Sequence, residues 1–396
     1  MKQTEIGLIP DDWEVKRLGE VAFLKSGKTI DFSTTKEGIY PCYGGNGIRT
    51  YIPFYSYDGA FPIIGRQGEL CGNVQYANGK FYATEHAVVC TPNSNVDSKW
   101  LYYQLINADI NKYKTGNAQP GISVDKINNE VCIPLPPFPE QQRIAKALSD
   151  VDALITTTEK LIQKKKNIKQ GTMQNLLTGK KRLPGFAKST NYKQTELGLI
   201  PEDWEVKSLG EFCQIKDGTH GTYARVENGY LLLSAKNILN GKLDIQESES
   251  LISENAYKEI VKNGFPKKKD LLISCVGTIG RCCIFDTDEE IAFQRSVAFI
   301  RQNQIDNLFL MYFIQSDLFQ KQLREAVNAS TLGGVYLGAF NPLQISFSSD
   351  KKEQTAIANV LSSMDKEIET LNTKLEKYLG LKTAMMQQLL TGKIRL

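Results

Sequence analysis

The most regular hydrophobic pattern of the chain lies near its C-terminus. From Ile357 onward, apolar side chains recur at alternating steps of four and three residues. The ten positions of this series are Ile357, Leu361, Met364, Ile368, Leu371, Leu375, Tyr378, Lys382, Met385 and Leu389. All of them except Lys382 are apolar or aromatic. This spacing puts one apolar stripe on one face of a helix, as in a coiled coil. The pattern predicts a long helix that packs against another helix.

A weaker copy of this stripe occurs earlier in the chain. Its positions are Ile144, Leu148, Val151, Ile155, Thr158, Ile162, Lys165, Lys169, Thr172 and Leu176. A shift of one residue gives a competing stripe, which consists of Leu154, Leu161 and Ile168. The sequence therefore leaves open which face of this helix packs. Gly179 and Gly392 follow the last apolar turn of each copy, as is typical of a helix C-terminus. We expect a helix pair, with each helix packing on its own domain as the alternative. The interface of this pair is predicted to consist of Ile144, Leu148, Val151, Ile155, Ile162, Ile357, Leu361, Met364, Ile368, Leu371, Leu375 and Tyr378.

The stretches before and between these helices read as mixed α/β structure. In the first half, short β-prone runs cover residues 61–65, 73–77, 80–84 and 87–91, and Asn78-Gly79 predicts a hairpin turn between two of them. In the second half, similar runs cover residues 230–234, 270–275, 281–285 and 292–301. Helical spacing appears over residues 100–108 and 307–327.

The chain contains two copies of the same plan. Residues 2–21 and 193–212 are identical at 16 of 20 positions, and residues 140–183 and 353–396 are identical at 20 of 44 positions. Between these pairs the halves diverge, although Glu85-His86 still aligns with Gln294-Arg295. A period this long indicates a duplicated domain, and two like halves favour a pseudo-twofold arrangement.

These observations predict an α+β fold. Two pseudo-twofold-related α/β domains are joined by two long helices that form an antiparallel coiled coil. We expect a first domain at 1–138, the first helix at 139–183, a second domain at 184–350 and the second helix at 351–396.

Composition narrows the class of protein. Apolar residues make up 41% and charged residues 23% of the chain, which is typical of globular domains. Lys plus Arg is 48 against 44 for Asp plus Glu, and this mild excess permits a nucleic-acid partner. No signal-peptide core or membrane-length apolar run occurs, so we expect a cytoplasmic protein without a membrane partner. The eight Cys form no CxxC pair and only two His are present, which favours free thiols over a zinc site.

Tests for enzyme motifs fail. Gly27-Lys28-Thr29 ends like a phosphate-binding loop, but Ala22 stands where the first glycine is required. Asn341-Pro342-Leu343-Gln344 departs from the Asn-Pro-Pro-aromatic loop that grips an extruded base. No dinucleotide-type glycine fingerprint or Ser-His-Asp spacing occurs.

One further motif has a structural explanation. Asp11 and Glu14 resemble the carboxylates of metal-dependent nucleases, but they lie only three residues apart instead of on neighbouring strands. The copy at Glu202 and Glu205 belongs to the repeated block. We interpret this block as a structural repeat anchored by a buried tryptophan, Trp13 or Trp204.

The remaining polar loops suit a surface that reads nucleic acid. Arg, Gln and Asn distinguish guanine and adenine edges, whereas Lys and backbone amides bind phosphates. In the first half, the candidates are Tyr43, Asn46, Arg49, Arg66, Gln67, Glu85, His86, Lys114, Asn117 and Gln119. In the second half, they are Lys216, Thr219, His220, Lys236, Asn237, Thr278, Arg281, Gln294 and Arg295. Each of these residues has the alternative of being a solvated turn or a satisfied hydrogen-bond partner, and Glu85 and His86 of being partners at the core edge.

A basic cluster on the first long helix has two interpretations. It consists of Lys160, Lys164, Lys165, Lys166 and Lys169. It is either a solvated helix face or a contact to the DNA backbone or an acidic partner.

The duplicated blocks resemble a known family. Repeated GLIPxDWEVKxLGE, Glu-Gln before a long helix, and LLTGKxRL endings are similar to the specificity subunit of type I restriction–modification systems. The tracts YGGNGIR, GRQGELCGN and ATEHAVV in the first half, and DGTHGT, LLISCVGTIGR and FQRSVAFIR in the second, resemble target-recognition domains.

This resemblance implies a function without chemistry in the chain itself. Each target-recognition domain would read one half of a bipartite asymmetric site in double-stranded DNA. The helices would fix the spacer and dock two modification (methyltransferase) subunits. Those subunits would bring S-adenosylmethionine, and restriction/translocase subunits would bring ATP-driven translocation and cleavage with Mg²⁺. The alternatives are a stand-alone site-specific endonuclease and a helical scaffold whose variable domains bind protein.

Overall fold

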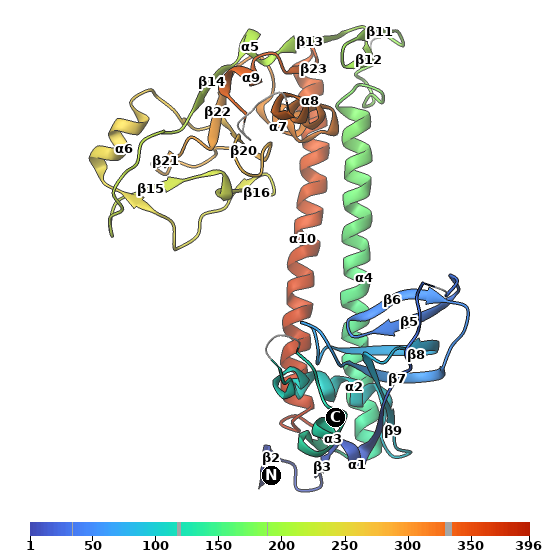
Figure 1. The fold of residues 1–396 in the computed structure, drawn as a ribbon. Coiled ribbons are helices and arrows are strands. Elements are labelled where there is room, and N and C mark those ends of the chain that lie inside the picture. The colour runs from blue at the N-terminus through green and yellow to red at the C-terminus, as the bar shows by residue number, and fades with distance from the viewer. Residues whose placement is uncertain (34, 117–119, 188, 329–334) are drawn as a thin grey trace. The chain divides into compact units, whose positions relative to one another are not determined.

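Both predicted long helices are present in the computed structural model, which describes residues 1–396 except 34, 117–119, 188 and 329–334 (Figure 1). They are α4 (Phe138–Leu176) and α10 (Lys351–Leu389), each of 39 residues. The chain divides into two compact units, Met1–Lys160 with Asn372–Leu396 and Leu161–Leu371. The boundary between the units therefore crosses both long helices.

In the first unit, the beginning of α4 packs beside the end of α10. Ile144 and Leu148 share one apolar cluster with Leu389. Further along, Asp152 of α4 forms an ion pair of 2.7 Å with Lys382 of α10. Rising residue numbers along α4 thus meet falling numbers along α10, so these segments are antiparallel.

In the second unit, the end of α4 packs beside the beginning of α10. Leu176 lies in one apolar cluster with Ile357 and Leu361. Lys165 forms an ion pair of 2.6 Å with Glu367, and Lys169 one of 2.5 Å with Asp365. These segments are antiparallel as well.

Burial distinguishes the two possible stripes of α4. The side chains of the 3-4 seam are buried from Ile144 to Ile162, namely Ile144, Leu148, Val151, Ile155, Thr158 and Ile162. The competing stripe is solvent-facing, with Leu154 45% and Ile168 44% exposed. In α10, Ile357, Leu361 and Ile368 are buried, and Met364, Leu371, Leu375 and Tyr378 are half-buried. The packing face of α4 is therefore the one that matches the repeat in α10.

The first unit contains a six-stranded sheet in the order β4-β9-β7-β8-β5-β6. Its strands are β4 (Ala22–Ser26), β5 (Tyr40–Gly44), β6 (Gly47–Ile52), β7 (Tyr57–Gly65), β8 (Val74–Ala83) and β9 (Ala87–Pro92). Two small sheets pair β1 (Lys2–Thr4) with β2 (Gly7–Ile9), and β3 (Glu14–Arg17) with β10 (Cys132–Leu135). The helices are α1 (Leu18–Val21), α2 (Ser98–Asn107), the 3₁₀ turn Ile110–Tyr113 and α3 (Val124–Glu130).

The predicted hairpin at Asn78-Gly79 is wrong. Both residues lie inside β8, which runs continuously from Val74 to Ala83. The long partner strand β7 explains this, because it pairs with β8 from Tyr57 opposite Phe81 to Ile64 opposite Val74. Gly79 lies opposite another glycine, Gly59, and both have positive φ, so the pairing of the two strands continues through this position without a turn.

The second unit repeats the plan with smaller sheets. One sheet has the order β14-β22-β19-β20, and another the order β18-β15-β21. These strands are β14 (Gln214–Asp217), β15 (Tyr230–Leu233), β18 (Leu251–Ile252), β19 (Leu271–Ser274), β20 (Cys282–Ile284), β21 (Ile291–Phe293) and β22 (Val297–Arg301). The two-stranded sheets are made by β11 (Tyr192–Thr195) with β12 (Gly198–Pro201), β13 (Trp204–Ser208) with β23 (Gln344–Ser348), and β16 (Ile238–Leu239) with β17 (Lys242–Leu243).

The helical spacing predicted for residues 307–327 is found as two consecutive helices. They are α7 (Asn307–Gln315) and α8 (Asp317–Asn328). Ser316 between them has extended backbone angles, with φ −69° and ψ 151°, and its hydroxyl donates to the Phe313 carbonyl. The other helical segments are α5 (Leu209–Phe212), the 3₁₀ turn Ala235–Asn237, α6 (Glu254–Val261) and α9 (Leu337–Phe340).

The repeated N-terminal blocks serve as structural anchors. Trp13 and Trp204 are fully buried. The Trp13 indole N–H donates to Glu140 Oε2 at 3.0 Å, and that of Trp204 donates to Glu353 Oε2 at 3.3 Å. Each block is thereby fixed to the first turn of a long helix, as expected for a structural repeat rather than a metal site.

Candidate DNA interface

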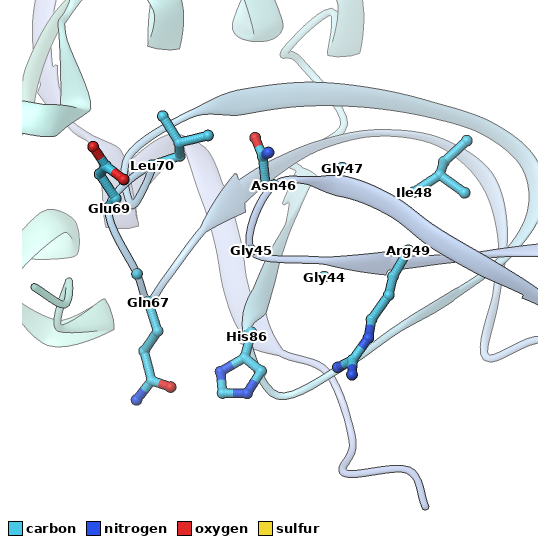
Figure 2. Close-up of a pocket in the computed structure, with 11 residues that line it drawn as sticks. Gly44, Gly45, Asn46, Gly47, Ile48, Arg49, Gln67, Glu69, Leu70 and His86 are labelled. Carbon is cyan, nitrogen blue, oxygen red and sulfur yellow. The ribbon is translucent and has the colours of Figure 1, made fainter. Parts of the chain in front are cut away.

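In the first unit, three loops form a groove of about 570 Å³. They are the turn between β5 and β6, the loop after β7 and the turn between β8 and β9. The lining residues are Gly44, Gly45, Asn46, Gly47, Ile48, Arg49, Gln67, Gly68, Glu69, Leu70 and His86. Figure 2 shows the side chains of Gln67, His86 and Arg49 on one side of the loop backbone and that of Asn46 on the other. The groove thus gathers four of the predicted residues.

Glycine allows two of these loops to approach closely. A Cβ atom at Gly65 would lie 1.9 Å from the Gly45 carbonyl oxygen. A Cβ atom at Gly45 would lie 2.8 Å from the Gln67 carbonyl oxygen. Only a residue without a side chain fits at such distances. The glycines of the YGGNG and GRQG motifs therefore bring Asn46 and Gln67 into one groove.

Glu85 and His86 leave polar atoms unsatisfied at this site. Glu85 Oε1 lies 3.3 Å from His86 Nε2. Glu85 Oε2 and His86 Nδ1 are shielded from solvent and have no hydrogen-bond partner among the described residues. Buried polar atoms normally have partners. His86 lines the groove, so its free ring nitrogen is a candidate for contact with a bound molecule.

The second unit has a groove of about 400 Å³. Its lining residues are Thr219, His220, Gly221, Thr222, Tyr223, Arg225, Leu232, Ser250, Ile252, Gln294 and Arg295. Backbone bonds fix the loop that carries the last two, because the Gln294 N–H donates to the Leu233 carbonyl and the Arg295 N–H to the Thr219 carbonyl. The Gln294 and Arg295 side chains are exposed. This groove also gathers four predicted residues.

The two grooves occupy equivalent places in the duplicated framework. Glu85-His86 connects β8 to β9, and Gln294-Arg295 connects β21 to β22. In both units the strand after the turn pairs with the strand that follows the repeated N-terminal block, β9 with β4 and β22 with β14. Equivalent positions therefore carry different side chains, His86 in one groove and Arg295 in the other.

Comparisons with known proteins agree with this duplicated plan. A family model described as the type I restriction modification DNA specificity domain matches twice, over residues 10–170 and 201–378. The type I restriction enzyme MjaVIII specificity subunit of Methanocaldococcus jannaschii is 30% identical over 98% of this chain and 94% of its own length.

This chain belongs to the family of type I restriction–modification specificity subunits.

Solved structures show the same fold. The S subunit of a type I restriction–modification system from M. genitalium matches with a TM-score of 0.65 at 17% identity, over 98% of both chains. A chain from a structure concerned with complex assembly and conformational transition of the type I system matches with a TM-score of 0.52 at 16% identity, over 98% of this chain and 100% of that chain. The predicted α+β fold and the family resemblance are confirmed, and the chain is a DNA-recognition subunit.

Two predicted contacts of the specificity subunit are corrected by burial. Tyr43 is 8% exposed and lies in an apolar cluster, where its ring meets the edge of Phe81 at 5.5 Å. Asn237 is 2% exposed, and its amide donates to Glu249 Oε1 at 2.6 Å while its Oδ1 accepts from the Ser234 N–H. Neither side chain is available at a DNA-reading surface.

Other predicted residues lie outside the grooves with partners of their own. Arg66 donates to Ser26 Oγ at 3.2 Å, and Lys236 forms an ion pair of 2.8 Å with Glu249. Their side chains are thus engaged within the subunit.

The remaining predicted residues lie in neither groove. Lys114, Lys216 and Thr278 are exposed, and Arg281 is half-buried. Asn117 and Gln119 lie outside the described residues.

Sequence reasoning missed four polar lining residues of the second groove. They are Thr222, Tyr223, Arg225 and Ser250. Arg225 lies five residues after His220, in the same long loop between β14 and β15. The signal for this cation is its position in the loop that begins with the DGTHGT motif and ends at the next strand.

The described residues contain neither a metal-binding cluster nor a helix suited to span a membrane. Within 1–396 without its four gaps, no group of three or more His, Cys, Asp or Glu side chains is arranged to bind a metal ion. Within the same residues, no helix is both long and apolar enough to cross a bilayer.

Proposed function

We propose that this specificity subunit reads a bipartite, asymmetric site in double-stranded DNA, with one groove for each half-site, and performs no chemistry itself. The observation that carries this proposal is the pair of equivalent grooves with different linings. The first offers Arg49, Gln67 and His86 on one side of the loops (Figure 2), and the second His220 and Arg295. Side chains of different hydrogen-bonding type select different bases. Two grooves with different lining residues on a repeated framework therefore favour a DNA site whose two halves differ in sequence.

The long helices support a role in spacing and assembly. The two helices are paired in both units, and a paired helix is a stiff support for the recognition domain that is attached to it. The exposed side chains Leu154, Leu161 and Ile168 recur every seven residues on α4 and remain uncovered in this chain. Such a stripe suits partner helices. We assign this surface to two modification subunits, which supply S-adenosylmethionine.

Restriction would come from further subunits. These restriction/translocase subunits bring ATP and Mg²⁺, and the complex acts in the cytoplasm where the DNA lies. The chain's own part is to bind and position DNA, and the failed enzyme motifs support this division of labour.

A domain exchange tests the bipartite reading. Residues 22–138 are replaced by the corresponding segment of another family member, and the chain is expressed with its own modification subunits. Motif-resolved methylation sequencing should show one changed half-site and one unchanged half-site. A change in both halves, or in neither, would contradict the proposal.

The two alternatives are tested with the purified chain. Incubation with plasmid and Mg²⁺ should produce no cleavage, whereas cleavage would favour a stand-alone endonuclease. DNA affinity should fall steeply as salt rises, because phosphate contacts release counterions. A protein-binding scaffold would show no DNA affinity at any salt concentration.

A further inference from the structure

In addition to apolar packing, hydrogen bonds join one helix of each recognition domain to its long helix at two separate points. In the first unit, one point lies at the start of α2, where the backbone N–H of the N-cap residue Asp97 donates to Gln141 Oε1 of α4 at 2.8 Å. The other lies along α2, where the hydroxyl of the fully buried Tyr103 donates to Asp152 Oδ2 at 2.7 Å. Two separated points fix the direction of α2 against α4, which a single point cannot do.

The second unit repeats both attachments. The backbone N–H of Asp306, the N-cap of α7, donates to Gln354 Oε1 of α10 at 2.7 Å. The hydroxyl of Tyr312, 2% exposed, donates to Asp365 Oδ2 at 2.8 Å. The positions on the long helix are eleven residues apart in both copies. The duplication therefore keeps the attachment while the groove linings differ.

A lysine from the other helix completes each second attachment. Lys382 of α10 pairs with Asp152 at 2.7 Å, and Lys169 of α4 pairs with Asp365 at 2.5 Å. A hydrogen bond to an ionised carboxylate is stronger than one between neutral groups. The tyrosine is thereby linked to both members of the helix pair. We call these sets the Tyr-Asp-Lys links.

The links connect to the grooves through packed structure. In the first unit α2 packs on β7 and β8, and the loops that follow these strands carry Gln67 and His86 (Figure 1). In the second unit α7 packs on β20. This strand lies in the sheet that includes β22, which follows Gln294 and Arg295. The orientation of α2 or α7 relative to the helix pair therefore determines the orientation of the groove in the same unit.

We propose that Tyr103, Asp152 and Lys382, and equally Tyr312, Asp365 and Lys169, are positioning residues that make the specificity subunit reject DNA sites with a wrong spacer. This inference rests on the proposed bipartite function. One added base pair moves a half-site by about 3.4 Å along the duplex and by about 35° around it. A recognition domain must turn to follow that displacement. The two hydrogen-bonded points oppose the turn together with the apolar packing, and loss of the tyrosine bond weakens that resistance.

The test uses the assembled modification complex with Tyr103→Phe, Tyr312→Phe and both together. The substrates are duplexes with the native half-sites and a spacer that is native, one base pair shorter or one base pair longer. We expect methylation of the native site to remain within about twofold of the unaltered complex. Methylation of the altered spacers relative to the native one should rise by about threefold to tenfold, because a charge-assisted hydrogen bond has been removed.

Matched variants separate positioning from general damage. Tyr102→Phe removes the hydroxyl of the residue beside Tyr103, and Tyr257→Phe removes that of an α6 tyrosine stacked on Tyr230. Neither hydroxyl makes a hydrogen bond with the described residues. Both variants should keep the native spacer profile. Lys382→Met, which breaks the first link at another residue, should relax the profile in the same direction as Tyr103→Phe.

The outcomes are distinct. An unchanged spacer profile in Tyr103→Phe and Tyr312→Phe, or an equal loss at all three spacers, would overturn this inference while the bipartite function stands. A native complex that recognises one undivided sequence would remove the proposed function and this inference with it.

Discussion

Arg395 and Glu140, 255 residues apart in the chain, lie in direct contact. The Arg395 Nη2 donates to Glu140 Oε2 at 2.7 Å, and its guanidinium also binds Asp12 Oδ2 at 2.8 Å. The arginine of the C-terminal LLTGKxRL motif thus joins the N-terminal repeated block to the start of α4. The first unit is closed by residues from both ends of the chain.

The second unit repeats this contact in a more buried form. Arg182 donates to Glu353 Oε2 at 2.7 Å and to Asp203 Oδ1 at 2.8 Å. The Arg182 side chain is 8% exposed and that of Glu353 0%, whereas Arg395 is 42% exposed. Both carboxylates also accept the indole N–H of a buried tryptophan. The repeated motifs are therefore explained by mutual contact, and the two copies differ in solvent access.

The first prediction follows from that difference. Arg182→Ala should lower the free energy of unfolding of the second unit by about 3 to 5 kcal/mol, because it leaves the Glu353 carboxylate buried without its partner. Glu140 is buried as well, but Arg395→Ala should cost less, since the Arg395 guanidinium is 42% exposed and water can take its place beside the carboxylate. Calorimetric unfolding of both variants measures the difference. The double variant Arg182→Met with Glu353→Gln removes both charges, and it should recover part of the loss. Equal costs for the two arginines would contradict the argument.

The second prediction concerns the glycine of the LLTGK motif. Gly179 has φ +67°, and a Cβ atom there would lie 2.4 Å from Pro201 Cδ. Gly179→Ala should cost about 3 kcal/mol or more, from backbone strain and overpacking together. Gly185→Ala is the matched control, with φ +85° and no atom within 4 Å of the added Cβ. It should cost about 1 kcal/mol in urea unfolding. If both variants cost the same, the contact with Pro201 contributes nothing.

Local periodic patterns were sufficient for the helices and the repeats. The apolar residues at alternating steps of four and three, such as Ile357 and Leu361, indicate which face of the helix is buried. This helix can therefore be predicted from residues that are close together in the sequence. The strand that contains Asn78-Gly79 was mispredicted, because the partner strand β7 decides whether that pair turns. A turn motif carries no information about a partner distant in the chain.

The candidate surface was predictable only as far as its loops. Short glycine-rich turns marked both grooves, but the free side chains depend on tertiary hydrogen bonds. Asn237 resembles a reader of adenine in the sequence, and Glu249, twelve residues later, occupies its amide. Lys165 and Lys169 belonged to a basic cluster with two interpretations, and α10 supplies their acidic partners Glu367 and Asp365. Exposure and pairing are properties of the folded chain.

The third prediction concerns pH and the buried thiols. All eight cysteines are free. Burial raises the pKa of Cys275 from 9.0 to about 11 and that of Cys283 to about 12. Above pH 9 the unfolded chain therefore loses thiol protons that the folded chain keeps. Each of these thiols should lower the free energy of unfolding by about 1 kcal/mol between pH 9 and pH 10.

Urea unfolding at several pH values measures this loss. Cys283→Ala should show a smaller decline between pH 9 and pH 10 than the unaltered chain. Iodoacetamide at pH 8 should label these two thiols only after denaturant is added. Rapid labelling of Cys283 in the folded chain would contradict the burial on which the prediction depends.

The last prediction assigns the two grooves to separate half-sites. Arg295→Ala removes an exposed guanidinium from the second groove, and Gln67→Ala removes an exposed amide from the first. A bidentate contact to a base edge contributes about 1 to 3 kcal/mol of discrimination, or about fivefold to 150-fold. Each variant should therefore relax the methylated motif at one or two positions of a single half-site. Motif-resolved methylation sequencing of cells that carry the complex reads this directly.

Lys268→Ala serves as the control for Arg295→Ala, because it removes an exposed cation of the same unit that pairs with Asp288 and lies outside the groove. It should leave the motif unchanged. Relaxation of both half-sites by Arg295→Ala would mean that the groove acts through overall affinity rather than base selection. A uniform loss of methylation without any change of motif would assign Arg295 to the phosphate backbone, since phosphate contacts carry no sequence information.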